Sequence, residues 1–582
     1  MSVPTVPDVL TALVVEAADA AGFAGVIDDI EPAAPTSNPS FGDYQSNHAF
    51  RIGRARRTNP RAVAQQVAAK LSSHPAVARV EVAGPGYINF YLDDAWIAQQ
   101  LTAQVLDPDA GVPQVGEGRT LVIDYSSPNI AKRMHIGHMR STIIGNTLLR
   151  LYQAAGWRTI ADNHIGDWGT PIGKLIVAWN GWRDDDKLAA DPIGELERLY
   201  VSFGKRAKED PSLAEQAREE TAKLQSGDAG NLALWQRFME ISRQERDAIY
   251  DRLGASFDVT HGESFYNDVL GDIIDNLLAA GVAKKSEGAV IVAFSEEAEP
   301  KMLRDTALVI RKQDGAALYG TTDVATLEHR VATWDPDLIV YVTDNRQQLH
   351  FQQFFSAWNQ WRAVRGETGL ERPELVHTYF GTLKINNATL STREGNSIRL
   401  ADLLDEAEQK ARAVVDEASP HLSEEERAAI ARGVGISSVR YFDLSQKPQS
   451  DVNFTWDKVL AMQGNSAPFL MYSYARSRSI QRRCEVTDPS PEGIVLGEEA
   501  ERALAVQLLQ FPSAVQAALE TQRPNLLCKY LFETAGALNR FVATCRVLGS
   551  DEQGSRIALL EATCRVLGKG LGLLGIEALD RM

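Results

Sequence analysis

The chain is poor in cysteine. Only four of its 582 residues are cysteines, all of them in the last fifth, and no two are spaced Cys-x-x-Cys. That spacing is a common mark of zinc and redox sites, and disulfide frameworks belong to shorter, cysteine-rich secreted chains. We therefore expect no metal site built by the protein, and reduced thiols buried in the core of a cytoplasmic protein.

Long apolar runs and an excess of positive charge are missing as well. No segment approaches the length that spans a bilayer, and the first residues lack the basic-then-apolar form of a signal peptide. The formal net charge is −17. A nucleic-acid partner is still possible, because a local basic patch can supply the attraction. With 582 residues, 44% of them hydrophobic, the chain has room for several domains and no expected membrane partner.

What the chain does contain is a predicted strand, a polar turn and a helix around one motif. Thr120 to Tyr125 is β-branched and aromatic, which predicts a buried strand, and Ser126-Ser-Pro128 ends it. From Met139 onward the apolar residues follow the helical period. The motif His135-Ile-Gly-His138 therefore stands at the turn into a helix. Open α/β sheets bind phosphate at that place.

Two histidines around a glycine suit a phosphate site. Gly137 has no side chain to keep a base or a phosphate away from the backbone. His135 and His138 lie on one side of the first helical turn and can donate hydrogen bonds to a phosphate chain. Such donors supply much of the catalysis where nucleotidyl transfer builds negative charge. The alternative is that the histidines only cap the helix, and the motif alone does not decide between the two.

The flanking residues are more specific. His-Ile-Gly-His after a strand resembles the first signature of class I aminoacyl-tRNA synthetases. Ser126-Ser-Pro-Asn-Ile-Ala-Lys-Arg-Met134 before it and Asn163-His-Ile-Gly-Asp-Trp-Gly169 after it resemble the arginyl-tRNA synthetases of that class. The resemblance implies a ligase that activates L-arginine with ATP to arginyl-adenylate. The arginyl group would then pass to the 3′-terminal ribose of tRNA(Arg). We expect Mg²⁺ to accompany ATP, and the enzyme to be a monomer.

The order of strand and helix patterns predicts a multidomain chain. Strands and helices alternate from 118 to about 380, which is typical of a doubly wound, Rossmann-like parallel sheet. The predicted parts are a small α+β N-terminal domain (1–117), a catalytic domain (118–385) with a helical insertion (about 183–253), a signature-loop and helical region (386–455) and an all-α domain (456–582). The resemblance implies that the first part touches the tRNA and that the last binds the anticodon.

Several residues match family positions that hold the amino acid. Arginine carries a planar cationic fork, which is best matched by a carboxylate. Two acids and a tyrosine match positions at the guanidinium, and two amides match positions near the α-amino group. The predicted arginine-binding residues are Asp124, Ser127, Asn129, Glu263, Tyr319, Asp323 and Gln347. Taken singly, an acid of this set could be a surface pair or a helix cap, and the tyrosine a core aromatic.

The second class I signature is a mobile loop usually written Lys-Met-Ser-Lys. It aligns here with Thr389-Leu-Ser-Thr392, so threonines occupy both lysine positions. In arginyl enzymes the lysine of Asn-x-Ala-Lys takes this role, which implies Lys132. The stretch could also be only a flexible turn. The predicted catalytic residues are His135, His138 and Lys132, and the predicted ATP-binding residues are His135, Gly137, His138, Ser391 and Thr392.

Two groups of arginines stand beside aromatic residues. The first lies close to Phe41, Tyr44 and Phe50, and the second close to Tyr472 and Tyr474. Arginines with aromatics suit a phosphate backbone and an unstacked base, although each group could be an ordinary solvated helix face. The predicted tRNA-binding residues are Arg54, Arg56, Arg57, Arg476 and Arg478.

Two rival functions make different demands on the sequence. A synthetase-like ligase that acts on a small acceptor would need neither arginine group, and both are present. A tRNA-binding paralogue without catalysis would carry degraded histidine and Gly-Asp-Trp-Gly motifs, and both motifs are intact.

Overall fold

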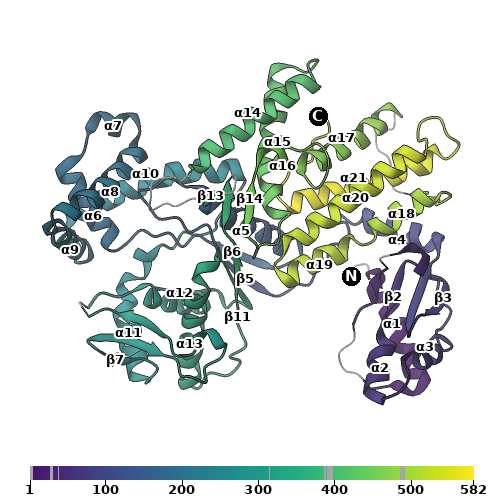
Figure 1. Cartoon of the computed structure of the whole chain (residues 1–582), viewed down its shortest axis with the longest axis horizontal. Helices are drawn as coiled ribbons and strands as arrows, with labels where there is room; N and C mark the ends of the chain where they lie inside the picture. Colours follow the sequence, from purple (N-terminus) through teal and green to yellow (C-terminus); the bar gives the residue numbers. More distant parts are fainter. Residues whose placement is uncertain are drawn as a thin grey trace. The chain divides into compact units, whose positions relative to one another are not determined.

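The chain divides into two compact units, residues 115–460 and residues 1–114 together with 461–582 (Figure 1). The computed structural model describes residues 4–26, 31–36, 38–313, 315–385, 388–389, 398–484, 490 and 492–582.

A parallel four-stranded sheet is the centre of the unit 115–460. Its strand order is β11-β10-β5-β6, and each neighbouring pair is parallel. The strands are β5 (Thr120–Tyr125), β6 (Arg158–Asp162), β10 (Leu338–Asp344) and β11 (Glu374–Phe380). All six residues of β5 are buried, as expected for a strand covered on both faces. The predicted doubly wound catalytic sheet is confirmed.

Helices cover both faces of this sheet. Helix α5 (Ile136–Ala154) packs close to β5, where a Cβ at Gly145 would lie 2.3 Å from Cβ of Tyr125. On the other face, Val122 belongs to a core shared with α11 (Leu270–Ala279), α12 (Tyr319–Trp334) and α13 (Gln348–Val364). The carboxyl ends of the strands therefore open between α5 and the first turns of α12 and α13.

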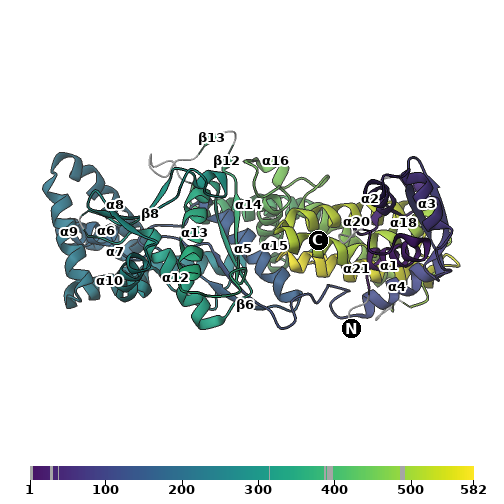
Figure 2. The same ribbon diagram turned by 90° about the horizontal axis from the view of Figure 1, so that it is seen from below.

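The predicted helical insertion is present. After α6 (Thr170–Trp182), the chain forms α7 (Asp185–Ala190), α8 (Pro192–Glu209), α9 (Ser212–Gln225) and α10 (Ala229–Leu253), which gather around α6 (Figure 2). Trp179, Leu196 and Phe238 are buried in their common core. The same core includes Ile130 and Ala131, two residues that precede the histidine motif.

The segment after the insertion begins as a 3₁₀ turn, η3 (Glu263–Val269), and becomes α-helical in α11. A hairpin follows as β7 (Lys284–Ser286) and β8 (Ala289–Ala293), and β9 (Ala307–Arg311) completes this antiparallel sheet. One 3₁₀ turn, η4 (Lys301–Leu303), lies between β8 and β9, and another, η5 (Asn345–Gln347), follows β10.

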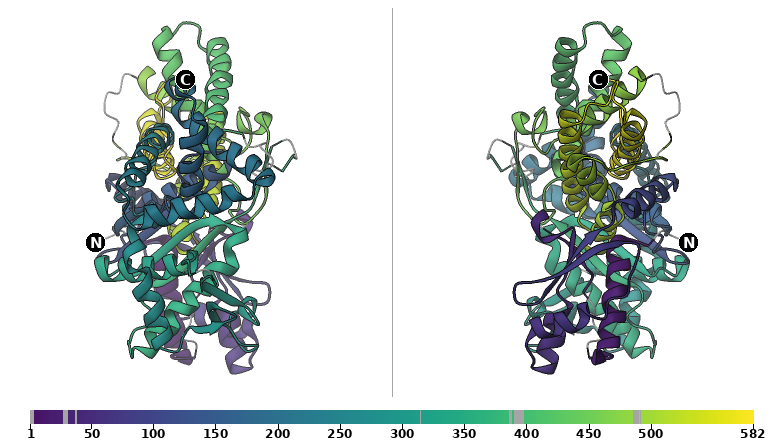
Figure 3. Two further views of the ribbon diagram at one scale, coloured as in Figure 1. Left: turned by 90° about the vertical axis from the view of Figure 1, so that its left-hand side faces the viewer. Right: turned by 90° about the vertical axis from the view of Figure 1, so that its right-hand side faces the viewer.

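The region 386–455 was expected to be helical after the signature loop, and its last residues differ from that expectation. Helices α14 (Leu400–Ala418) and α15 (Glu424–Leu444) pack against each other, as Figure 3 shows (green). After them, β14 (Val452–Phe454) pairs in parallel with β12 (Leu383–Ile385), which also pairs with β13 (Ala388–Thr389). A strand of three residues is too short to give a recognisable period in sequence. The unit ends with α16 (Trp456–Val459).

The N-terminal part of the other unit is an α+β domain with an antiparallel sheet ordered β1-β2-β4-β3. Its elements are α1 (Val6–Ala18), a π-turn (Asp19–Phe23), β1 (Ala34–Pro35), a 3₁₀ turn (Pro39–Phe41), β2 (Tyr44–Ser46), α2 (His48–Arg56), α3 (Pro60–Ala68), β3 (Val77–Ala83), β4 (Tyr87–Leu92) and α4 (Asp94–Leu106). The sequence prediction included neither α2 nor α4.

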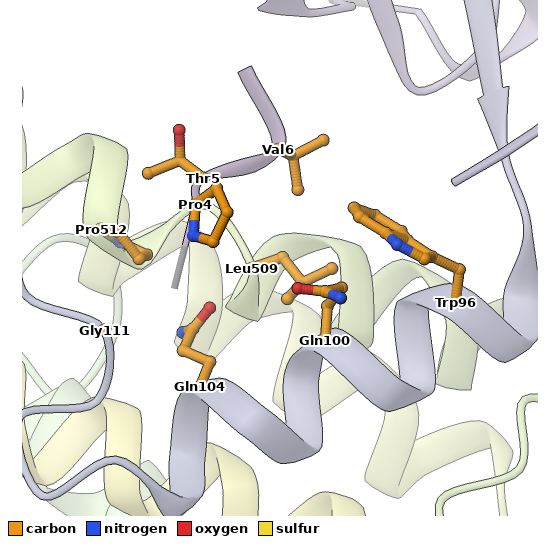
Figure 4. A pocket seen from close by; sticks show the side chains of 9 residues that line it. All are labelled: Pro4, Thr5, Val6, Trp96, Gln100, Gln104, Gly111, Leu509 and Pro512. Atoms are coloured by element: carbon orange, nitrogen blue, oxygen red, sulfur yellow. The ribbon is translucent and has the colours of Figure 1, made fainter. Parts of the chain in front are cut away.

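Five helices form the C-terminal part, namely α17 (Ala467–Arg483), α18 (Glu499–Leu508), α19 (Phe511–Thr521), α20 (Pro524–Thr544) and α21 (Gln553–Leu573). Helix α4 packs on them, and Gln104 donates to the backbone oxygen of Leu508 at 3.0 Å. Figure 4 shows Trp96, Gln100 and Gln104 of α4 facing Pro4 and Leu509. The space left there is about 10 Å³, so the contact is closely packed.

The four thiols are free. Cys528, Cys545 and Cys564 are buried, and Cys484 is partly buried. Across the described ranges, no helix is both long enough and apolar enough to pass through a membrane.

Candidate active site

His135 and His138 cap helix α5. The Nδ1 atom of His135 accepts the backbone N–H of Gly137 at 3.0 Å, and Nδ1 of His138 accepts the N–H of His135 at 3.2 Å. Burial and the nearby charge of Lys132 lower the pKa of His135, and burial with His135 lowers the pKa of His138 to about 3. Both rings are therefore neutral at pH 7. Because each Nδ1 is an acceptor, each Nε2 carries the proton and is the donor for a ligand. Capping and phosphate binding are compatible.

Two glycines permit close packing at the carboxyl edge of the sheet, Gly137 against His135 and Gly166 against Asn129. A Cβ at Gly137 would lie 2.6 Å from Cε1 of His135, so any other residue there would displace the ring. A Cβ at Gly166 would lie 1.8 Å from Oδ1 of Asn129. The backbone of Ile130 donates to the oxygen of Gly166 at 3.1 Å. Asn129, which is predicted to bind the substrate arginine, thus lies directly beside the His-Ile-Gly-Asp-Trp-Gly segment.

Asp124 is engaged by an arginine of the chain itself. Its Oδ2 accepts from the fully buried Arg330 at 2.6 Å, and Arg330 also binds Asp162 at 2.8 Å. The hydroxyl of Ser127 donates to Oδ1 of Asp124 at 2.8 Å. Asp124 and Ser127 were predicted to line the arginine pocket. These contacts make Asp124 part of a buried ion network that joins the ends of β5 and β6 to α12.

Two other predicted acids and a tyrosine interact at the open edge. Tyr319 and Asp323 stand one turn apart at the start of α12, and Tyr319 is 63% exposed. Burial and the charges of Asp167 and Asp323 raise the pKa of Glu263 to about 8. Burial, Glu263 and Asp323 also raise the pKa of Tyr319. Glu263 therefore lies within electrostatic reach of Asp167 and Asp323, and Tyr319 within reach of Glu263 and Asp323.

Sequence reasoning gave no role to His350, yet it belongs to this edge. Its Nε2 lies 2.5 Å from Oδ2 of Asp323, and the hydrogen bond and charge of Asp323 raise the pKa of His350 against the effect of burial. His350 is on the first turn of α13, three residues after the predicted and exposed Gln347. The spacing Gln-x-x-His was the available signal. Asp167 was also missed, and it accepts from the backbone and hydroxyl of Ser264 at 2.9 and 2.6 Å.

Lys132 and Arg133 have different surroundings. The exposed Lys132 forms no ion pair with the described residues, and its Nζ lies 4.2 Å from the ring centroid of Tyr200. Arg133 is mostly buried and is paired with acids. Its side chain is 13% exposed and bonds Asp191 at 2.5 Å, with Glu245 at 3.8 Å. Of the two cations, only Lys132 is uncommitted.

Ser391 and Thr392, the predicted loop residues, lie outside the described residues. The described chain after them is fixed at the histidine motif. The backbone oxygen of Ile398 accepts from Ile136 at 3.1 Å, and Leu400 donates to the oxygen of Met134 at 2.9 Å.

Comparison with known proteins accounts for this arrangement. Residues 100–456 match the family described as tRNA synthetases class I (R), catalytic domain. The chain belongs to the arginyl-tRNA synthetases. Residues 8–92 match the arginyl tRNA synthetase N terminal domain, and residues 470–582 match the DALR anticodon binding domain. As a member of this family, the protein is an arginine–tRNA ligase of class I, and ATP, arginine and tRNA are the substrates that the family implies.

Individual arginine–tRNA ligases are similar in sequence to almost the whole of this chain. An arginine–tRNA ligase of Fusobacterium nucleatum is 42% identical, with 94% of each chain covered. That of Cellvibrio japonicus is 40% identical over 94% of this chain and 95% of its own. Among solved structures, the arginyl-tRNA synthetase of Plasmodium falciparum superposes with a TM-score of 0.85 and covers 100% of both chains. At 24% identity, that structure supports the fold.

The arginines predicted to bind tRNA fall into two kinds. Arg54, Arg56 and Arg57 are exposed at the end of α2 and form no ion pair with the described residues. Arg476 is exposed on α17. Arg478, in contrast, bonds Glu561 at 3.1 Å and Asp580 at 3.2 Å, so its charge is used within the domain.

The aromatic neighbours of the first group also need a correction. Phe41 is 52% exposed, and the rings of Phe50 and Tyr87 meet edge to face at 4.8 Å. Tyr44, which was expected beside the arginines as a possible stacking surface, is fully buried in the core. Tyr44 is therefore not available to stack on an unpaired base of the tRNA.

Proposed function

We propose that this synthetase forms arginyl-adenylate at the carboxyl edge of the β11-β10-β5-β6 sheet and transfers arginine to the 3′-terminal ribose of tRNA(Arg). The observation that supports the proposal is the electrostatic coupling of Glu263, Asp323 and Tyr319 in the same α/β unit in which two neutral histidines cap helix α5. A pocket with several carboxylates selects a cationic side chain, and neutral imidazole donors next to it suit the phosphates of ATP.

In the activation step, the arginine carboxylate attacks the α-phosphorus of ATP and pyrophosphate leaves. His135 and His138 donate from Nε2 to the oxygens that gain charge, and Gly137 keeps the backbone open to the nucleotide. Lys132 supplies the positive charge that the threonines of the signature loop cannot carry. Ser391 and Thr392 are proposed as additional ATP ligands from that loop.

Arginine itself is proposed to lie across the edge of the sheet. Glu263, Asp323 and Tyr319 bind the guanidinium, while Asn129 and Gln347 bind near the α-amino group. Asp124 and Ser127 support the site indirectly. Asp124 binds Arg330 and Ser127 binds Asp124, and these contacts order the end of β5, which Asn129 follows in the chain.

Mg²⁺ is proposed to enter with ATP. The side chains at the phosphate site offer imidazole and ammonium nitrogens, whereas Mg²⁺ takes oxygen ligands. Phosphate oxygens would therefore hold it, and no residue of the chain is assigned to it. We further propose a monomer acting in the cytoplasm, with the four-part division 1–117, 118–385, 386–455 and 456–582. Analytical ultracentrifugation tests the oligomeric state.

The direct test of the function is to charge total tRNA with each of the twenty labelled amino acids. We expect arginine alone to be attached, at a rate that depends on ATP. Attachment of another amino acid would overturn the assignment, and so would arginine transfer to a small acceptor in place of tRNA.

The raised pKa of Glu263 makes arginine binding depend on pH. The guanidinium favours the ionised carboxylate, so arginine lowers this pKa below its free value of about 8. Below pH 8 binding must expel the proton, and affinity rises with pH until Glu263 is ionised. We expect the KM for arginine to fall by up to about tenfold per pH unit toward pH 8 and then to level off. In Glu263→Gln the KM should be higher and this dependence lost; a wild-type profile in that variant would contradict the assignment.

Binding of tRNA should depend on the exposed arginines of α2. Replacing Arg54, Arg56 and Arg57 with glutamine is expected to raise the KM for tRNA. It should also reduce the slope of log affinity against log salt, by about 0.7–0.9 for each phosphate that the variant no longer neutralises. Arg478→Gln is the matched control, because that guanidinium is already paired, and its slope should equal that of the wild type. An unchanged slope in the triple variant would mean that this group is an ordinary solvated face.

A further inference from the structure

A tyrosine of the helical insertion, Tyr200, contacts the proposed catalytic residue Lys132. Tyr200 is on α8, and its half-buried ring lies under the ammonium of Lys132, at 4.2 Å from Nζ to the centroid. A cation at that distance is attracted by the negative face of the ring. Tyr200 also contributes to the raised pKa of Tyr319, so it lies on the side of the arginine pocket too.

The other charged groups around Lys132 do not fix it as closely. Glu197, one turn before Tyr200 on α8, attracts Lys132 but also lies 4.0 Å from Arg133. Lys174 on α6 repels it. Lys132 in turn lowers the pKa of His135 and of His138, which places its charge close to both donors. Among the described residues, the ring of Tyr200 is the one direct partner of the ammonium.

We propose that Tyr200 is a positioning residue for adenylate formation: its ring holds the ammonium of Lys132 beside His135 and His138. A lysine on a flexible stem loses much rotamer freedom when it binds a phosphate, and a ring that restricts it beforehand reduces that loss. The ammonium has three N–H donors, so one side can face the ring while others reach phosphate oxygens. The inference rests on the proposed role of Lys132.

The test is the rate of arginyl-adenylate formation in variants at position 200. Tyr200→Leu is expected to slow this step about 3- to 30-fold, the range for removal of one cation–π interaction. Tyr200→Phe keeps the ring and should match the wild type. Val201→Ala, an exposed neighbour on the same helix, is the control and should also match it. Phenylalanines with increasing fluorination at position 200 keep the shape but weaken the ring face, so they should slow the step progressively even if Tyr200→Leu unfolds.

A second comparison separates positioning from general damage to the fold. In a Lys132→Ala background, Tyr200→Leu should cause no further loss, because the ring acts through that lysine. Equal losses with and without Lys132 would overturn the proposal, and so would a slow Tyr200→Phe or a fluorinated series of constant rate. If Lys132→Ala is itself fast, the proposed role of Lys132 fails together with this inference. If Lys132→Ala is slow but Tyr200→Leu is as fast as the wild type, only the inference about Tyr200 fails.

Discussion

Replacing Lys132 with alanine is expected to slow arginyl-adenylate formation by about 10²–10³-fold, the usual cost of removing one preorganised stabiliser of the transition state. Negative charge builds on the departing pyrophosphate, and the threonines at 389 and 392 cannot balance it. The neutral histidines donate hydrogen bonds but bring no charge. Lys132 is the uncommitted cation beside them, because Arg133 is already neutralised by Asp191.

Pre-steady-state measurement of arginyl-adenylate decides this expectation. The KM for arginine should stay close to the wild-type value, since Lys132 is proposed to bind the phosphates and the charged groups that act on it, Glu197 and Lys174, are not among the proposed arginine-binding residues. Arg133→Ala is the adjacent control. Its adenylate rate should change little, although removing the bond to Asp191 is expected to lower its Tm. A Lys132→Ala enzyme that forms adenylate at the wild-type rate would exclude the lysine from this role.

The fold could be predicted wherever local pattern and burial agree. Thr120–Tyr125 is β-branched and buried throughout, and the helix after the histidine motif has a clear apolar period; both are present as β5 and α5. The prediction failed where tertiary contacts decide. Helix α4 carries a weaker signal, and its polar Gln104 is buried by a bond to Leu508 that lies far along the chain.

One repeated heptapeptide shows this limit directly. Ala-Thr-Cys-Arg-Val-Leu-Gly occurs at 543–549 and again at 562–568. In the first copy helix α20 ends at Thr544, and Cys545 is extended with φ −107° and ψ 112°. The second copy is helical from end to end within α21. The same heptapeptide therefore adopts two conformations, and its tertiary contacts determine which one forms at each place.

In the candidate site, too, local sequence indicates some residues but not the partners that they contact. Motifs point to His135, Asp323 and Glu263 as candidates, because each lies in a short recognisable run of residues. Their partners come from distant segments, such as Arg330 for Asp124, His350 for Asp323 and Tyr200 for Lys132. Nothing local in the sequence states those pairings. On α17, likewise, composition does not distinguish the exposed Arg476 from Arg478, which is held by Glu561 and Asp580.

Arginine selection should depend most strongly on Asp323. In Asp323→Asn the amide keeps the shape but not the charge, and an unpaired guanidinium in this pocket costs roughly 2–5 kcal/mol. That corresponds to an increase in the KM for arginine of about 30-fold or more. The KM for ATP should stay nearly constant, because Asp323 lies in the second turn of α12, whereas the capping histidines lie at the start of a different helix, α5.

Two controls separate the charge of Asp323 from its contacts. Asp272→Asn removes an exposed carboxylate on α11 and should leave the KM for arginine unchanged. His350→Gln removes the imidazole bonded to Asp323 but keeps the carboxylate, so we expect a smaller increase than in Asp323→Asn. An increase equal to that of Asp323→Asn would mean that the histidine, not the carboxylate charge, dominates. An unchanged KM for arginine in Asp323→Asn would show that the guanidinium binds elsewhere, and the pocket built from Glu263, Tyr319 and Asp323 would have to be abandoned.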